Sequence, residues 1–331
     1  MKAVCHIIDN MGVGGAQTMM SELVNGFFKY RPDITTRVVV LNKEGVVNPY
    51  SLSLDFCNRD NLARFLEDNQ IGIVVQHRTN DSSCIKKWLP SSVKYVLVNH
   101  TWNNIDRMAR FKRCDHYISV CKFLDDHTEW KVNASQRSMV LNGLENENIG
   151  TILPAKLDGK LKIGRCHRLL GNKFSVESLK WVGYYMPKDL VYYIVGENDE
   201  AKQLAKRYPN IRYLGPITDY EKKISIIKGF DIYFYETFGN EGASMAVLES
   251  LACGVPVLCS PFGGNGELIT HNVNGLLLKT KQEYQEMLRY MYNLPALVQA
   301  FKDRSKEDFA SRLHIKHVVE KYADIFETVT E

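Results

Sequence analysis

The sequence lacks several features that mark specialised classes of protein. No stretch approaches the ~20 consecutive apolar residues that a membrane-spanning helix needs, so we expect no such helix. There is no repeat of fixed period and no low-complexity segment, which argues against solenoid and disordered architectures. The first apolar run, in MKAVCHIIDNMG, is too short for a signal peptide. These absences predict a soluble globular protein of the cytoplasm.

Patterns for zinc and nucleic acid are also missing. The 8 cysteines are scattered and form no CxxC pair, so we expect no structural zinc, and Cys5, Cys166 and Cys259 are expected to be buried. A net charge of +4 is too small an excess to predict a nucleic-acid partner. The densest basic stretch is interpreted as a solvated helix face or, alternatively, as a peripheral contact with anionic lipid at the inner face of the membrane. It consists of Arg107, Arg110, Lys112 and Arg113.

What the sequence has is an alternation of short apolar runs and amphipathic stretches. Its 331 residues suffice for two domains of about 150 residues each. Strands are predicted at residues 3–8, 36–41, 71–76, 95–99, 116–120, 139–141, 161–165, 191–195, 211–214, 232–235 and 255–259. Helices are predicted between most of them, clearly at 16–29, 244–252, 281–293 and 315–328. Such alternation is typical of parallel sheets covered on both faces.

The alternation pauses once, at residues 146–160, which contain Gly150, Pro154 and Gly159 and are interpreted as a linker. We therefore predict an α/β protein with two Rossmann-like domains, at 1–148 and 149–310. A helix within 311–331 is expected to pack back toward the first domain. Ligands of open α/β sheets bind at the carboxyl ends of strands, so the cleft between two such domains is the expected site.

The first predicted strand runs into a glycine-rich loop, Asn10-Met-Gly-Val-Gly-Gly-Ala-Gln17, and then a helix. Gly12, Gly14 and Gly15 would permit close backbone approach and positive φ, and a helix N-terminus attracts anions. The dinucleotide fingerprint GxGxxG is not present, because Gln17 stands at its third glycine. By itself this loop predicts either an anion site or merely a tight connection.

A second segment, from Glu236 to Leu258, combines a strand end, a loop with Glu241 and Gly242, a helix and another strand. Its helix start offers N–H groups and a positive dipole to a phosphate. Glu249 can accept hydrogen bonds from a pair of ribose hydroxyls. Helical geometry would separate Glu241 and Glu249 by ~12 Å, too far for the paired carboxylates of a retaining glycosidase. They are therefore expected to bind two parts of one elongated ligand.

These motifs resemble those of retaining glycosyltransferases of the GT-B fold, family 4 type. The resemblance rests first on Glu241-x7-Glu249 followed by Ser-Leu-Ala-Cys-Gly-Val-Pro-Val. Further similar segments occur in the expected order along nearly the whole chain. They are Gly14-Gly-Ala-Gln17, Asp115-His-Tyr-Ile-Ser-Val120, Asn142-Gly-Leu-Glu145, Tyr193-Ile-Val-Gly-Glu197, Gly263-Gly-Asn-Gly-Glu267 and Asn274-Gly275. The chain departs from the family at Gly242-Ala243-Ser244, where Gly-Phe-Gly is usual.

The resemblance implies roles for individual residues. Arg168 and Lys173 would hold the donor diphosphate as its bond to the sugar breaks, with Arg165 as a competing candidate. Glu249 would bind the ribose, and Glu241 would face the donor sugar. His100, after a predicted strand, would lie beside that sugar, although a lone histidine there is as often structural. Other donor contacts are expected from Gly14, Gly15, Gly242, Ser244, Met245 and Ala246.

The implied activity is transfer of a hexosyl group, with retention of configuration, from a nucleoside-diphosphate sugar to an acceptor hydroxyl. The donor is expected to be UDP- or GDP-linked, without a metal or other cofactor. A glycan or glycolipid of cell-surface polysaccharide or lipopolysaccharide would be the acceptor. Three alternatives remain: a sugar-nucleotide epimerase of the same fold, a catalytically silent binding protein, and an esterase using Ser244. The last rests on Gly242-Ala-Ser244-Met-Ala246, which lacks the final glycine of a nucleophile elbow.

Overall fold

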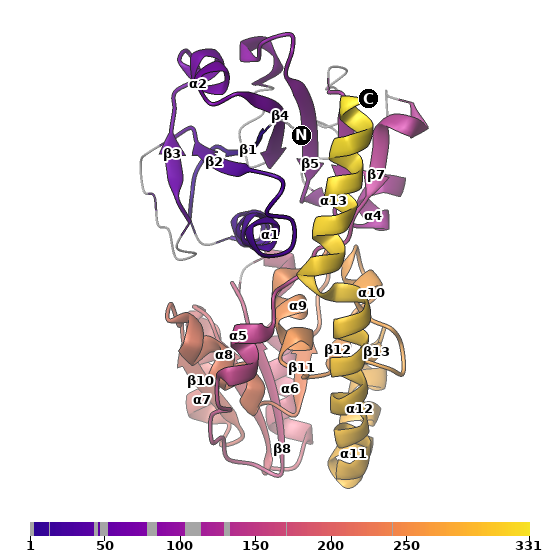
Figure 1. Cartoon of the computed structure of the whole chain (residues 1–331). Helices are drawn as coiled ribbons and strands as arrows, with labels where there is room; N and C mark the ends of the chain where they lie inside the picture. The colour runs from indigo at the N-terminus through magenta and orange to yellow at the C-terminus, as the bar shows by residue number, and fades with distance from the viewer. Residues whose placement is uncertain are drawn as a thin grey trace. The chain divides into compact units, whose positions relative to one another are not determined.

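The computed structural model describes residues 3–12, 14–42, 46, 52–77, 85–102, 114–128, 133–169, 171–239 and 241–331. The chain divides into two compact units, one of Met1–Glu145 with Ile315–Glu331 and the other of Asn146–His314. Both units are α/β, each with its own parallel sheet (Figure 1). No helix in the described ranges is long and apolar enough to cross a bilayer. The basic stretch Arg107, Arg110, Lys112 and Arg113 lies outside the described residues.

The first unit is built on a seven-stranded parallel sheet in the order β3-β2-β1-β4-β5-β6-β7. Its strands are β1 (Ala3–Ile8), β2 (Thr36–Val40), β3 (Leu54–Phe56), β4 (Ile71–His77), β5 (Lys94–Asn99), β6 (His116–Ser119) and β7 (Arg137–Met139). Its helices are α1 (Gly15–Tyr30), α2 (Leu62–Asp68), α4 (Lys122–Asp126) and α13 (Ile315–Thr330), with short turns η1 (Ile85–Trp88) and η3 (Ala134–Gln136). β4 is buried along its whole length, as expected for a strand covered on both faces.

The last helix of the chain, α13, belongs to the first unit. Phe27 of α1 stacks on Phe326 of α13 with ring centroids 5.7 Å apart. Gly26 lies where a β-carbon would come within 2.7 Å of the Val319 side chain, so its lack of a side chain allows the two helices to approach. Apolar residues of α13 thus pack against α1, which itself lies on β1, β2 and β4.

The second unit has a six-stranded parallel sheet in the order β10-β9-β8-β11-β12-β13. Its strands are β8 (Leu161–Cys166), β9 (Leu190–Val195), β10 (Ile211–Gly215), β11 (Ile232–Tyr235), β12 (Val257–Cys259) and β13 (Gly275–Leu277). Its helices are α5 (Glu147–Thr151), α6 (Glu177–Tyr185), α7 (Asp199–Arg207), α8 (Tyr220–Gly229), α9 (Met245–Ala252), α10 (Asn265–Leu268), α11 (Lys281–Asn293) and α12 (Pro295–Asp308). Two short turns are η4 (Gly171–Lys173) and η5 (Phe309–Leu313).

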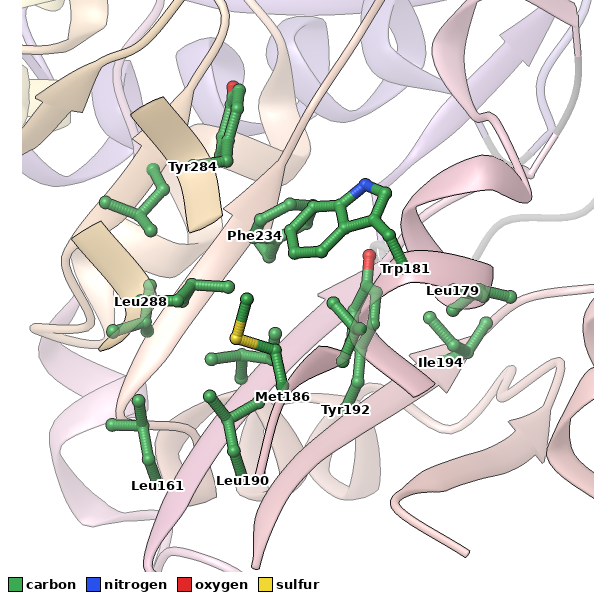
Figure 2. Close-up of a cluster of buried hydrophobic side chains, with 14 of the residues drawn as sticks. Leu161, Leu179, Trp181, Met186, Leu190, Tyr192, Ile194, Phe234, Tyr284 and Leu288 are labelled. Atoms are coloured by element: carbon green, nitrogen blue, oxygen red, sulfur yellow. The ribbon is translucent and has the colours of Figure 1, made fainter. Parts of the chain in front are cut away.

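An aromatic core fixes the central strands of this sheet. Trp181 of α6 meets Phe234 of β11 edge to face with ring centroids 5.9 Å apart, and Tyr192 of β9 meets Phe234 at 5.3 Å. Figure 2 shows these rings together with Tyr284 of α11 and the surrounding aliphatic side chains. Because such interiors are close-packed, this core holds β9 and β11 in place against α6 and α11.

The prediction of two Rossmann-like sheets is confirmed, and each predicted strand and named helix is present within about two residues at most bounds. The predicted linker at 146–160 begins at the boundary between the two units, but its residues belong to the second unit. It contains α5, and it is held to α8 by hydrogen bonds from Ala155 N to Ser225 O (2.8 Å) and from Lys228 Nζ to Ile149 O (2.9 Å). The three-residue strands β3 and β13 were not predicted, since so short a run carries little periodicity.

Candidate functional site

The candidate site of the second unit lies where its strand order reverses, between β8 and β11. In open parallel sheets this switch point opens a crevice at the carboxyl ends of the strands. Tyr235, the last residue of β11, is buried there. Its hydroxyl donates to Glu241 Oε2 at 3.3 Å and lies 3.1 Å from Ser244 Oγ at the start of α9. Tyr235 thus connects the carboxylate of Glu241 to the N-terminus of α9.

Lys173 and Glu241 meet at this place. Lys173 Nζ lies 3.2 Å from Glu241 Oε1, and the lysine side chain is 41% exposed whereas that of Glu241 is 8% exposed. An ammonium group with one buried partner and one open side can still pair with an incoming anion. The structure therefore brings together two of the residues expected at the donor site.

The two candidate arginines differ sharply in burial. Arg165 of β8 is 0% exposed, with its guanidinium 5.1 Å from the rings of both Phe174 and Tyr235. Its Nε is 2.6 Å from His167 Nε2, and its Nη2 donates to the carbonyl of Lys173. Arg168 is exposed. Arg165 therefore supports η4 and Lys173 from within, while the guanidinium open to a ligand is that of Arg168.

Glu249 is placed inside α9 with a partner that the sequence did not reveal. Its carboxylate accepts from Lys223 Nζ of α8 at 2.7 Å, and its side chain is only 9% exposed. α8 and α9 are separated by β11 in sequence, so only their packing brings the two residues together. A buried carboxylate that a single lysine neutralises keeps lone pairs for further hydrogen bonds.

The loop after β12 shapes the start of α9. Gly264 N donates to Glu241 O at 2.8 Å, and Ser244 N donates to Asn265 Oδ1 at 2.9 Å. The backbone N–H of Ser244 is therefore bonded to Asn265, and the donor contacts expected of Ser244, Met245 and Ala246 stay predictions. Met245 and Ala246 follow in the first turn of α9, and Gly242 lies buried before it.

A further acid at this end of β11, Glu236, was not predicted as a site residue. It is 7% exposed, and within the described ranges its Oε2 has no hydrogen-bond partner. Burial raises the pKa of this carboxyl, and the charges of Arg165 and Lys281 oppose that rise. No sequence signal distinguished it, since an acid after a strand is common at protein surfaces.

In the first unit, the glycine-rich loop leads directly into α1. Gly14 precedes the helix with φ −167°, and Gly15 is its first residue. The loop does not use the positive φ that its glycines would permit, since the glycines with positive φ among the described residues lie elsewhere in the chain. Gly14 leaves room for Gln17, whose Nε2 donates to Asn10 Oδ1 at 3.0 Å. His100 lies after β5 and is hydrogen-bonded to His77, as described below.

The geometry also bears on a metal site and on the esterase hypothesis. Among the described residues, no group of His, Cys, Asp or Glu is arranged to hold a metal ion. An esterase nucleophile needs a base in contact with its hydroxyl. Within the described part of the chain, Ser244 Oγ contacts only the hydroxyl of Tyr235, which is no such base. The geometry thus gives the esterase hypothesis no support.

Comparison with known proteins decides the family of the second unit. Residues 161–308 match the family described as Glycosyl transferases group 1. They form a glycosyl transferases group 1 domain. This domain contains every residue of the site around β8, β11 and α9, from Arg165 to Asn265.

Relatives extend the likeness beyond this domain. The O-antigen biosynthesis glycosyltransferase WbnH of Escherichia coli is 23% identical, with 99% of each chain covered. A glycosyltransferase of Methanocaldococcus jannaschii is 28% identical over 66% of this chain, and the match spans 59% of that relative's length. The resemblance to glycosyltransferases is thereby confirmed.

The fold of the whole chain matches solved glycosyltransferase structures. HepE of Anabaena, solved in complex with UDP-glucose, superposes with a TM-score of 0.79 at 13% identity, covering 99% of this chain and 100% of HepE. The lipopolysaccharide outer core galactosyltransferase WaaB gives a TM-score of 0.73 at 14% identity, covering 99% and 100%. At such identities the likeness shows the fold, and the predicted GT-B fold is confirmed.

Proposed function

We propose that the protein is a retaining glycosyltransferase that moves a hexosyl group from a UDP- or GDP-linked sugar to a hydroxyl of a glycan or glycolipid acceptor. The observation that carries the proposal is a pair of buried glutamates, Glu241 and Glu249, each matched to a lysine beside α9. Such a site can bind an elongated ligand that is polar at both ends. HepE was solved with UDP-glucose, and WbnH is named for O-antigen biosynthesis, which supports this class of donor and acceptor.

The proposed reaction exchanges one bond to the anomeric carbon for another. The bond from this carbon to the diphosphate oxygen breaks, and a bond to the acceptor oxygen forms on the same face. The acceptor proton passes to the departing diphosphate. Lys173, with Arg168 exposed nearby in sequence, would neutralise the charge that develops on the leaving group, so we expect no metal requirement. We further propose a cytoplasmic location, with peripheral membrane contact for a lipid-linked acceptor.

The first test is nucleotide binding, measured by thermal shift with UDP, GDP, ADP and CMP. A ligand that binds only the folded state stabilises it by ~2.7 kcal/mol at a hundredfold excess over its dissociation constant. We expect one nucleoside diphosphate to raise the melting temperature of the native protein. Glu249→Gln should abolish the shift, because the amide donates where ribose hydroxyls need an acceptor. Glu286→Gln, on α11 and hydrogen-bonded to Gln282, is the matched control and should retain it.

The second test follows the product. With the matching nucleotide sugar and a panel of acceptors, proton NMR should show the anomeric configuration of the donor in the product, in the presence of EDTA. An inverted product, or activity that returns only with Mg²⁺, would refute the mechanism. A changed donor sugar without any transfer would instead identify the epimerase. Binding without either reaction would favour the silent binding protein.

A further inference from the structure

Three histidines of the first unit stand in one row across adjacent strands. We call His6, His77 and His100 the histidine row. β1 pairs with β4 so that His6 lies beside Val75, and β4 pairs with β5 so that His77 lies beside Val98. Side chains of a strand alternate between the two faces. His77 therefore shares a face with Val75 and His6, and His100 follows two residues after Val98.

Hydrogen bonds connect the row from ring to ring. His6 Nδ1 lies 2.9 Å from His77 Nε2, and His77 Nδ1 lies 3.1 Å from His100 Nε2. The ring centroids are 5.2 Å and 5.4 Å apart. Each contact needs one N–H and one lone pair, and a neutral imidazole has one of each. The tautomer of His77 therefore fixes the other two, and all three rings carry hydrogen either on Nδ1 or on Nε2.

Burial supports the neutral form of every ring. Removal from water lowers the pKa of His6 to about 3 and that of His100 to about 4. The pKa of His77 is also well below its usual value, because of burial first and of its two histidine neighbours second. At neutral pH each ring of the row is therefore neutral and carries one N–H.

The inner end of the row distinguishes the two tautomers. His6 Nε2 is buried and has no hydrogen-bond partner among the residues that the structure describes. A buried N–H without a partner is rarer in proteins than an unused acceptor, so we expect Nε2 to be the unprotonated nitrogen of His6. His6 then carries its hydrogen on Nδ1, and so do His77 and His100. The outer end is His100, which is 9% exposed against 0% for His6 and 1% for His77.

We propose that His6 and His77 are positioning residues that hold His100 neutral, with its hydrogen on Nδ1, so that its outer edge presents a fixed N–H donor to an oxygen of the substrate. The identity of that ligand rests on the proposed function, whereas the shared tautomer does not. A lone histidine in solution prefers the other tautomer and exchanges between both. In the row, the hydrogen bond from His77 fixes the tautomer of His100 before the ligand binds.

The first part of the test reads the tautomers directly. In the full chain labelled with ring-¹⁵N histidine, long-range ¹H–¹⁵N spectra at pH 7.5 should show His6, His77 and His100 with a protonated Nδ1. Signals of the Nε2–H form, or averaged signals, would overturn the proposal. This readout needs no substrate, and assignments come from single substitutions. His77→Phe retains a ring but breaks both hydrogen bonds, so His100 should become averaged.

Matched variants separate positioning from packing. His77→Gln retains an amide that can accept from one neighbour and donate to the other, and it should restore part of the Nδ1–H signal of His100. His127→Phe replaces an exposed histidine of the same unit and should leave the row unchanged. If His77→Phe fails to fold, the spectrum of the native protein and of His77→Gln still decides the tautomers.

The second part of the test uses the transfer reaction. His77→Phe should lower kcat/KM for the donor by about tenfold, the loss expected for one hydrogen bond of ~1.4 kcal/mol, and His127→Phe should not. Unchanged donor kinetics in His77→Phe would overturn the positioning role while leaving the proposed function intact. No turnover by the native protein would instead refute the proposed function, together with the ligand that we assign to His100.

Discussion

At the scale of single residues, Gly263 is a position of the proposed donor site where the backbone leaves no room for a side chain. Its φ is +66°, and a β-carbon there would lie 2.3 Å from Glu241 O and 2.4 Å from Glu241 N. Both contacts are to backbone, which cannot rotate aside as a side chain would. The conformation of the loop after β12 and the placement of Glu241 therefore depend on each other.

Gly263→Ala is expected to destabilise the protein by roughly 1–3 kcal/mol, the cost of a non-glycine residue in a strained left-handed conformation. It should also abolish the thermal shift with nucleoside diphosphate, because Glu241 must move. Urea unfolding and the nucleotide thermal shift measure the two effects. Gly266→Ala is the control, since its β-carbon would meet nothing closer than 3.8 Å. Equal behaviour of the two variants would contradict the argument.

At the scale of elements, the end of α12 is tied to the loop before β13 through one buried carboxylate. Asp308 accepts from Arg312 Nε and Nη2 at 2.9 Å, from Thr270 Oγ1 at 2.9 Å and from Asn274 Nδ2 at 2.8 Å. Asn274 is fully buried and β13 follows it directly. Asp308 thus connects the helices that close the second unit to the edge strand of its sheet.

Asp308→Ala should lower the free energy of unfolding by about 2–3 kcal/mol, because one N–H of the buried Asn274 amide loses its acceptor while the other still donates to Leu268 O. Asp303→Ala, an exposed position of the same helix whose carboxylate accepts from Gln299, should cost less than about 0.5 kcal/mol. Urea unfolding of both variants provides the comparison. A cost for Asp308→Ala no larger than that of its control would show that the network contributes nothing.

At the scale of the whole molecule, buried neutral histidines couple stability to pH. The folded pKa values of the histidine row lie below the ordinary value of ~6.5 that the unfolded chain has, and burial lowers the pKa of His167 in the second unit as well. Below pH 6.5 the unfolded state therefore binds protons that the folded state does not. The stability that these histidines contribute is fully present above pH 6.5 and is lost as the pH falls toward their folded pKa values.

The free energy of unfolding should consequently fall between pH 6.5 and pH 5, at up to ~1.4 kcal/mol per pH unit for each such histidine. Carboxylates with ordinary or lowered pKa values contribute little in this window. Urea unfolding at closely spaced pH values measures this slope. His6→Phe should reduce the slope by the contribution of one proton, up to ~1.4 kcal/mol per pH unit. A slope that stays flat down to pH 5 would mean that the row takes up protons in the folded state.

The sequence by itself determined the local features of this protein. The apolar runs specified the strands, because residues of a parallel strand that is buried on both faces are nearly all apolar. The loop and helix from Glu241 to Glu249 were recognisable because all their parts are neighbours along the chain. The two-sheet GT-B fold followed from the order of these elements and from the family resemblance.

Only the tertiary structure decided which distant residues meet. Lys223 pairs with Glu249 because α8 and α9 pack together, and neither residue carries a sign of the other in the sequence. Arg165 and Arg168 are close in sequence, yet one is buried and one is exposed, because β8 ends between them. His6, His77 and His100 form a row because β1, β4 and β5 are neighbours in the sheet in one register. Local pattern fixes which elements form, whereas strand order and register fix which side chains meet, and those depend on the packing of the whole sheet.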